Sequence, residues 1–96
     1  MEKKSKKLVL VRAYSAGVHF GELVSKKGKE VVLKNSRRVW YWDGACSLSQ
    51  LAVSGGNDNS KISVTVPEIE LTEAIEIITC TKAAAKWLSE VNAWQK

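Results

Sequence analysis

The sequence predicts a mainly β protein: an antiparallel sheet of five or six strands, curled or closed into a partly open small barrel, with one short helix and a C-terminal helix. Three observations predict this class. Several short segments alternate apolar and polar residues, as strands with one buried face do. Clusters of glycine, asparagine and serine separate these segments by short connections, which favours antiparallel neighbours. Helix signals are confined to a capping pattern at Ser47 and to an apolar stripe after Thr81.

The first part of the chain reads as extended segments joined by turns. Leu8–Tyr14 is apolar and rich in β-branched residues, and Val18–Ser25 is predicted as a second strand. Gly21, in the middle of that strand, marks a bulge or the close approach of another backbone. Lys27–Lys29, with glycine at its centre, is a hairpin turn into a third strand, Glu30–Lys34. We therefore expect these strands to pair with one another.

The middle of the chain carries a fourth extended segment and a short helix. After a break at Asn35–Ser36, Arg37–Trp42 alternates its side chains between two faces. Ser47 and Gln50 fit a capping box, in which the serine side chain accepts from the third helical amide and the glutamine reaches back. The pattern predicts a helix over Leu48–Ser54 that stops at the glycine which follows it.

Two more strands and the closing helix complete the expected fold. Lys61–Val66 should point its isoleucine and valines inward, and Glu68–Thr79 should form one long last strand with a bulge near Glu73–Ala74. Thr81 is placed to cap the closing helix. The apolar stripe of that helix comprises Ala84, Trp87, Leu88, Val91 and Trp94.

Length and composition indicate one domain of a soluble protein. The chain has 96 residues, of which 45% are hydrophobic and 26% charged, a normal balance for globular proteins. We expect residues 1–7 to form a flexible basic tail and residues 8–96 a single globular domain. The longest apolar runs have four residues, too few for a membrane span of roughly 18 or for the core of a signal peptide. Two cysteines without a metal-ligand spacing favour a reducing cytoplasm.

The sequence contains no recognisable catalytic machinery. His19 is the only histidine, and Cys46 and Cys80 lie far apart in the chain, so neither a catalytic dyad nor a zinc site is indicated. Neither of the glycine-rich phosphate-binding motifs is present. We therefore expect a protein that is not an enzyme and that uses no cofactor and no metal ion.

Charge is distributed unevenly along the chain. The net charge is +5, but residues 1–38 carry +8 and residues 39–96 carry −3. A strongly basic segment attracts phosphates on nucleotides, nucleic acids or membrane surfaces. The alternative for the N-terminal lysines is a solvated tail that only aids solubility.

The strongest candidate for binding is the segment from Arg37 to Ser47. Arg38, Trp40 and Trp42 should share one face of an extended strand, so that a flat aromatic surface lies beside a guanidinium group. Such a combination holds phosphates and bases. Arg37 points to the opposite face, so only one of the two arginines can reach a given pocket, and Ser47 could supply a second phosphate contact at its helix end. Alternatively, the tryptophans are core or subunit-interface anchors and the arginines pair with the acidic half.

A second candidate segment surrounds the first turn. Gly17 and Gly21 permit close approach of a ligand or of another backbone, and Tyr14, His19 and Phe20 could stack against a ring. The alternative is a hairpin whose aromatic residues belong to the ordinary core.

Three segments together resemble a family of small tailed-phage and prophage proteins of unknown function. They are Arg12–Gly21, the segment Arg37–Ala45 continued through Leu48–Ala52, and Pro67–Ile78, and the resemblance covers about residues 9–81. The Arg-Arg-x-Trp-Tyr-Trp run is its most specific part. The resemblance implies a small phage accessory protein that acts in the cytoplasm of an infected bacterium, and it implies no activity and no catalytic residue.

These observations favour a protein that binds, without catalysis, a small phosphorylated nucleotide. Cyclic nucleotides and ADP-ribose-type immune signals belong to this class, and sequestering such a signal would make the protein a counter-defence sponge. So many tryptophans in so small a chain predict a homo-oligomer, with Trp40, Trp42 or Trp94 at the contact and pockets between subunits. Two alternatives remain open: a nucleic-acid-binding accessory protein that uses the basic half, and a protein–protein inhibitor of a host defence protein. No membrane partner is expected.

Overall fold

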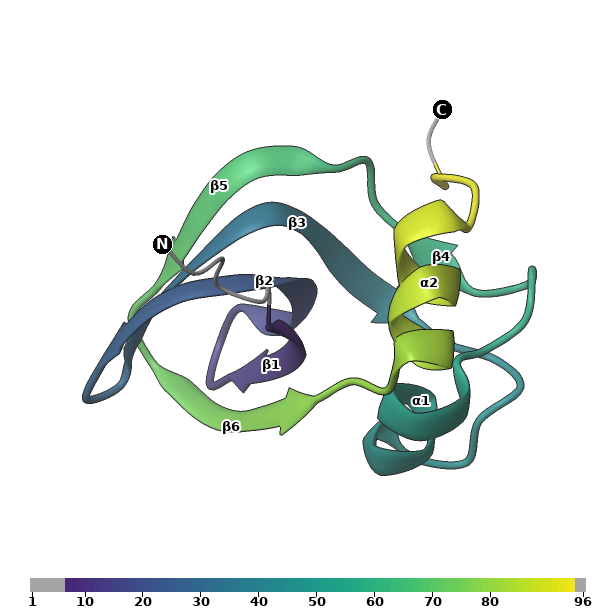
Figure 1. Cartoon of the computed structure of the whole chain (residues 1–96), viewed down its shortest axis with the longest axis horizontal. Helices are drawn as coiled ribbons and strands as arrows, with labels where there is room; N and C mark the ends of the chain where they lie inside the picture. Colours follow the sequence, from purple (N-terminus) through teal and green to yellow (C-terminus); the bar gives the residue numbers. More distant parts are fainter. Residues whose placement is uncertain (1–6, 95–96) are drawn as a thin grey trace, which may run out of the picture.

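The structure, a computed structural model, describes residues 7–94 and confirms the predicted class (Figure 1). Six strands form one curled, open antiparallel sheet that is accompanied by two helices. In chain order the elements are β1 (Leu8–Ala13), β2 (Gly17–Lys27), β3 (Glu30–Tyr41), α1 (Leu48–Ser54), β4 (Lys61–Ile62), β5 (Val66–Leu71), β6 (Ala74–Thr79) and α2 (Lys82–Glu90). Most of the predicted basic tail lies outside the described residues. Within them, no helix has the length and apolar character needed to cross a membrane.

The sheet is built around the long strand β3. β1, β2 and β3 follow one another as antiparallel neighbours, and β6 pairs with the free side of β1. The other side of β3 is shared, because Val31–Ser36 pairs with β5 whereas Val39–Tyr41 pairs with β4. In Figure 1 β5 and β6 arch around β1 and β2 from opposite sides, which gives the sheet its curl. The chain therefore closes most of a barrel without completing it.

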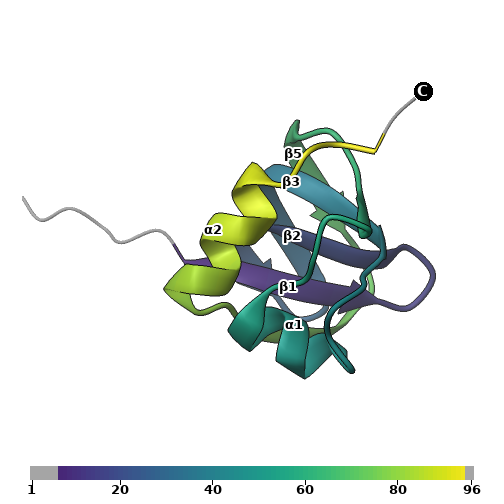
Figure 2. The same ribbon diagram turned by 90° about the vertical axis from the view of Figure 1, so that its right-hand side faces the viewer.

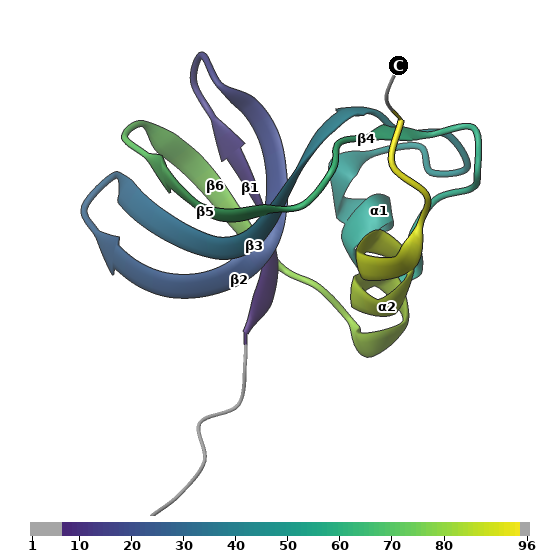
Figure 3. The ribbon, with the colours of Figure 1, turned by 90° about the horizontal axis from the view of Figure 1, so that it is seen from above.

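Hydrophobic residues fill both faces of the sheet. Alternate residues of β1 point in opposite directions: Val9 and Val11 into the curl, Leu10 toward the helices. Figure 2 shows α1 and α2 side by side against the sheet, and Figure 3 shows the curled sheet and the helices as neighbouring halves that share β3. The cluster inside the curl comprises Val9, Val11, Ala13, Val31, Leu33 and Leu71. The cluster under the helices comprises Leu10, Val18, Phe20, Val39, Leu51, Ala52, Ile62, Ala85 and Leu88.

The predicted break at Asn35–Ser36 is wrong, because Glu30–Tyr41 is one continuous strand. The signal that suggested a break is a bulge: the pairing steps from Phe20–Arg37 to Glu22–Lys34, so β3 carries one extra residue there. Asn35 adopts the left-handed conformation, with φ of 50°, which asparagine tolerates better than most residues. Gly21 lies opposite the bulge, where an added Cβ would meet the Cα of Ser36 at 3.3 Å. The expected bulge or close approach at Gly21 is confirmed.

Two predictions in the second half are also wrong. The strand predicted over Lys61–Val66 stops at Ile62, because Ser63 turns its polar groups onto β3 and interrupts the ladder. The single strand predicted over Glu68–Thr79 is two strands, β5 and β6, which pair with different strands. The turn between them is held by hydrogen bonds from Tyr14 N to Glu73 O and from Ala74 N to Lys29 O.

Both helices begin where the capping signals predicted. Ser47 accepts from Gln50 N, and Thr81 accepts from Ala84 N. The Gln50 side chain accepts from Cys46 N at 2.8 Å, one residue earlier than the capping box predicts. α2 ends at Glu90, so Trp94 lies beyond the helix rather than on its stripe.

Candidate ligand-binding site

A pocket opens on the concave side of the sheet, between the second half of β3 and the chain that connects β4 to β5. Its volume is about 220 Å³. We call it the inner pocket; its lining residues are His19, Ser36, Arg38, Trp40, Ser63, Val64, Val66 and Ile69. His19 of β2 and Arg38 of β3 are register partners and so share this face. Arg38 and Trp40, which were expected to share a strand face, therefore line one pocket together with His19, which was named in a separate candidate segment.

Two side-chain atoms of residues that line the inner pocket are buried without a hydrogen-bond partner. His19 and Ser36 are each 1% exposed, and neither His19 Nδ1 nor Ser36 Oγ has a partner. Native proteins satisfy nearly all buried polar atoms, since an unsatisfied one costs about 1–3 kcal/mol. These two atoms are therefore the most unusual polar feature of the residues that line the pocket.

The protonation state of His19 follows from its surroundings. Its Nε2 lies 2.9 Å from the carbonyl oxygen of Ala16, which can only accept, so Nε2 carries a proton. Burial lowers the pKa of His19 below 6.5, and the positive charge of Arg38 lowers it further, although the Ala16 bond opposes them. The ring is neutral at pH 7, and Nδ1 presents a lone pair. His19 thus keeps one acceptor, Nδ1, that no described residue satisfies.

Ser63 and the two arginines fix the wall of the inner pocket. Arg38 N–H donates to Ser63 Oγ at 2.7 Å, and Ser63 N–H donates to Arg38 O at 2.9 Å. Arg37 Nε donates to Ser63 O at 2.8 Å, and Arg37 Nη1 donates to Leu88 O at the end of α2, also at 2.8 Å. Arg37 is only 4% exposed. It lies on the helix side of β3, so Arg38 is the arginine that is available to a ligand.

Trp40 forms an exposed aromatic side of the site. It is 54% exposed, and its ring meets that of Trp94 edge to face at 5.3 Å. Lys61 Nζ lies 5.0 Å from the centre of the Trp94 ring, and the backbone N–H of Trp94 donates to Ile62 O. These contacts hold Trp94 against β4 and limit the positions of Trp40. Despite the contact with Trp94, about half of the Trp40 side chain therefore stays exposed.

A second depression lies on the other side of Arg38 and Trp40. We call it the turn pocket; it has a volume of about 300 Å³ and is lined by Ser15, Ala16, Gly17, Val18, Arg38, Val39, Trp40 and Trp42. The predicted binding residue Trp42 is half-buried and contributes to this pocket while it also packs on the core under the helices.

The remaining predicted binding residues lie elsewhere. Phe20 is a core residue, 2% exposed, which agrees with the alternative that it packs. Tyr14 is 77% exposed in the β1–β2 turn and lines neither pocket. Ser47 caps α1 and lines neither pocket either. The inner pocket is therefore built from a subset of the predicted residues.

Sequence reasoning missed five residues that complete the inner pocket. Ser36 was assigned to a break between strands, Val64 and Val66 to the core, and Ser63 and Ile69 to strands without a role in binding. The signal for Ser36 was present, because Gly21 and Asn35 together mark a bulge that turns the serine inward. The position of residues 63–66 depends on pairing with β3, which a sequence does not reveal.

Other features of the described residues carry less chemistry. A larger depression of about 410 Å³ lies between the start of β1 and α2, but no aromatic ring and no buried unpartnered polar atom lines it. Among residues 7–94, no group of three His, Cys, Asp or Glu side chains is placed to hold a metal ion. Burial raises the pKa of the Cys80 thiol to about 11, so this cysteine is not a nucleophile at neutral pH.

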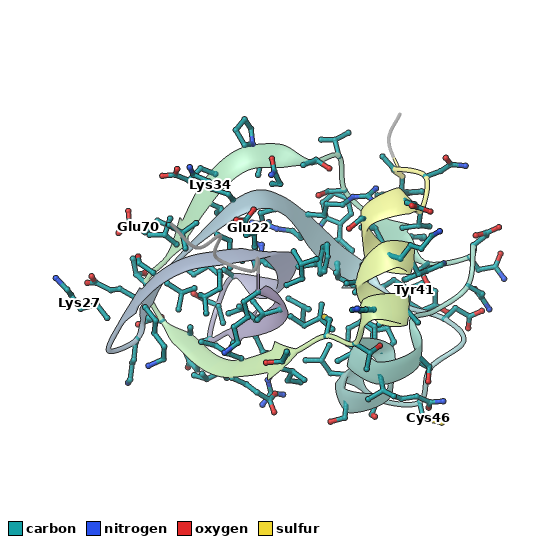
Figure 4. The ribbon with its side chains drawn as sticks, in the orientation of Figure 1. Glu22, Lys27, Lys34, Tyr41, Cys46 and Glu70 are labelled. Atoms are coloured by element: carbon teal, nitrogen blue, oxygen red, sulfur yellow. The ribbon has the colours of Figure 1, made fainter. Side chains whose placement is uncertain are left out.

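The structure also shows where the charged residues of the two halves of the chain lie. Lys34 of β3 lies opposite Glu22 of β2 and opposite Glu68 of β5. Figure 4 shows Lys27 at the β2–β3 hairpin, at the other end of the molecule from Tyr41. Lys34 therefore has acidic residues on both neighbouring strands, and the inner pocket is separate from the lysine-rich hairpin.

Comparison with known proteins gives one match. Residues 6–88 match the model of a protein family described as a domain of unknown function (DUF6948). No curated protein and no solved structure matches the chain.

Proposed function

The chain belongs to the DUF6948 family, and because the family's function is unknown, we propose from the pocket that the protein binds a small phosphorylated nucleotide without catalysis. The observation that carries the proposal is the inner pocket itself. It combines two buried, unpartnered polar atoms with an exposed tryptophan and a guanidinium group that forms no ion pair among the described residues.

Each part of the pocket matches one part of a nucleotide. The exposed ring of Trp40 suits stacking of a base, which contributes about 1–3 kcal/mol. The neutral His19 accepts from a ring N–H or amino group, and the hydroxyl of Ser36 both donates and accepts. Arg38 presents a fork of donors to a phosphate. A pocket of about 220 Å³ encloses one ring rather than a whole nucleotide. The base therefore lies inside, and the phosphate lies at the mouth.

The cellular role that we propose is sequestration of a nucleotide signal. The resemblance to small phage and prophage proteins sets the context, the cytoplasm of an infected bacterium. A binder without catalytic groups lowers the free concentration of its ligand in proportion to its own abundance. Such a protein would act as a counter-defence sponge against an immune signal of the cyclic nucleotide or ADP-ribose type.

The direct test has two parts. Native mass spectrometry of protein purified from infected cells should show a retained phosphorylated molecule. Calorimetric titration with ribonucleoside monophosphates, cyclic nucleotides and ADP-ribose should then identify binding to the purified chain. Arg38→Ala should weaken the observed binding by about 10- to 100-fold, the scale of a charge-assisted hydrogen bond.

Arg12→Ala is the matched control. Arg12 is also an exposed arginine on the sheet, but it pairs with Glu76 at 3.5 Å and lines neither pocket. Its replacement should leave nucleotide affinity within about twofold of the wild type, less than 0.5 kcal/mol. Equal losses in both variants would show a nonspecific effect of net charge. The absence of binding by every nucleotide would refute the proposal.

A further inference from the structure

We propose that the ligand is a dinucleotide, with one base in the inner pocket, the second in the turn pocket and the linking phosphate on Arg38. This inference rests on the proposed function and specifies its ligand. The observation behind it is that the two pockets have two residues in common, Arg38 and Trp40. One guanidinium and one indole thus stand between two spaces that each suit a ring.

The register of the sheet explains why there are two spaces. His19 pairs with Arg38 and Val18 with Val39, and the next residue, Gly17, lines the turn pocket together with Trp40. Gly17 has φ of 84° and no side chain, and no atom lies within 4 Å of the position that a Cβ would occupy. The side of Trp40 next to the β1–β2 turn is therefore open. A larger residue at this position would cover the ring and remove the turn pocket.

Size and charge favour two nucleosides over one. The pockets measure about 220 and 300 Å³, so the inner pocket is too small to enclose a complete nucleotide and the turn pocket is at the lower limit for a ligand site. The combined volume of the two pockets falls within the usual range for small-molecule binding sites. A phosphodiester carries one negative charge, which one arginine neutralises, whereas a terminal phosphate carries about 1.5–2.

The two pockets differ in chemistry, so the two bases should be recognised differently. The inner pocket holds the buried unpartnered atoms of His19 and Ser36 and can select a base by its donors. The turn pocket also contains polar groups, from Ser15 and Arg38, but none of its side-chain atoms is buried and unpartnered. We therefore expect selectivity for one base and tolerance for the other.

The experiment compares dinucleotides with their halves. The probes are the dinucleoside monophosphates ApA, GpG, CpC and UpU and the corresponding mononucleotides, titrated by calorimetry. The best dinucleotide should bind about tenfold or more tightly than its mononucleotide, the scale of one additional stacked base. Mixed dinucleotides, tested in both orders, should then show strong discrimination at one position only.

Filling each pocket separately assigns the bases to the two sites. Ser15→Trp, in the turn pocket, should abolish the advantage of the dinucleotide and leave the mononucleotide affinity within about twofold. Val64→Trp, at the exposed edge of the inner pocket, should lower the affinity for both the mononucleotide and the dinucleotide. Ser25→Trp is the control, since Ser25 is an exposed residue of β2 that lines neither pocket.

The outcomes separate this inference from the proposed function. If mononucleotides bind as tightly as dinucleotides, or if Ser15→Trp leaves the dinucleotide affinity unchanged, the two-pocket inference is wrong while nucleotide binding stands. If none of the probes and no nucleotide signal binds, both are wrong. Circular dichroism and thermal melts of each variant confirm that the fold is retained, so that a loss of affinity refers to the pocket.

Discussion

Replacing Arg37 by alanine should destabilise the fold, although the neighbouring Arg38 can be replaced at little cost. Arg37 is 4% exposed, and its guanidinium donates to Leu88 O and Ser63 O, both at 2.8 Å. These two bonds join three parts of the chain: β3, the end of α2 and the connection from β4 to β5. Because no carboxylate pairs with this buried cation among the described residues, the carbonyl oxygens provide its main stabilisation.

The magnitude follows from the two hydrogen bonds. A bond that involves a charged group contributes about 1.5–3 kcal/mol. Part of this is regained because water can reach the freed Ser63 carbonyl and because the desolvation of a buried cation is relieved. We expect a net loss of about 2–4 kcal/mol in the free energy of unfolding, which lowers the Tm by roughly 10–25 °C in a domain of this size.

Urea denaturation followed by tryptophan fluorescence measures this loss. Arg37→Ala should shift the midpoint strongly, Arg37→Lys should recover part of the loss by keeping one donor, and Arg38→Ala should stay within about 0.5 kcal/mol of the wild type. A loss below about 1 kcal/mol for Arg37→Ala would refute the assignment of Arg37 as a structural anchor.

Four further predictions address pH, thiol reactivity, salt and assembly. Burial lowers the pKa of His19 in the folded state, so as pH falls below 6.5 the unfolded chain binds the proton before the folded chain does. The free energy of unfolding should therefore decline below that pH. Denaturation curves of His19→Gln should lack this decline. Under native conditions iodoacetamide should modify Cys46, which is exposed, much faster than Cys80, whose thiol pKa is raised to about 11; equal rates in mass spectra would contradict this. Nucleotide affinity should change by less than about tenfold between 50 and 200 mM salt. The affinity of a nucleic-acid-binding protein that neutralises many phosphates would fall by about 10³- to 10⁵-fold over the same range. Sedimentation should show a species larger than the 10.6 kDa monomer, and Trp94→Ala should weaken it; a monomer at all micromolar concentrations would remove the proposed intersubunit contact.

Local signals in the sequence predicted the local parts of the structure. The hairpin turn at Gly28, the bulge at Gly21 and the capping residues Ser47 and Thr81 each depend on a few neighbouring residues, and all four are present. The opposite orientation of the two arginines also follows from strand alternation alone. These features are encoded within one turn or one strand, so single-sequence reasoning reaches them.

Features that depend on distant pairing were not predictable. Val66 alternates with polar residues as a core strand does, yet it is 37% exposed because β5 pairs with the outer edge of β3. The division of Glu68–Thr79 into two strands depends on pairing with β3 and β1, at opposite sides of the sheet. For the site, Arg38 and Trp40 were expected on one strand face and His19 in a separate candidate segment. All three line the inner pocket, which Ser36 and Ser63 join only through the bulge and the folded connection.

Nuclear magnetic resonance of the His19 ring tests the central claim most directly, that a nucleotide binds in the inner pocket. In the free protein, long-range ¹H–¹⁵N spectra should show an unprotonated Nδ1 and a protonated Nε2 bonded to Ala16 O. Addition of a saturating nucleotide should shift the Nδ1 resonance as it accepts a hydrogen bond, together with the indole N–H of Trp40. A nucleotide that binds while both resonances stay unchanged would place the site elsewhere and contradict the account.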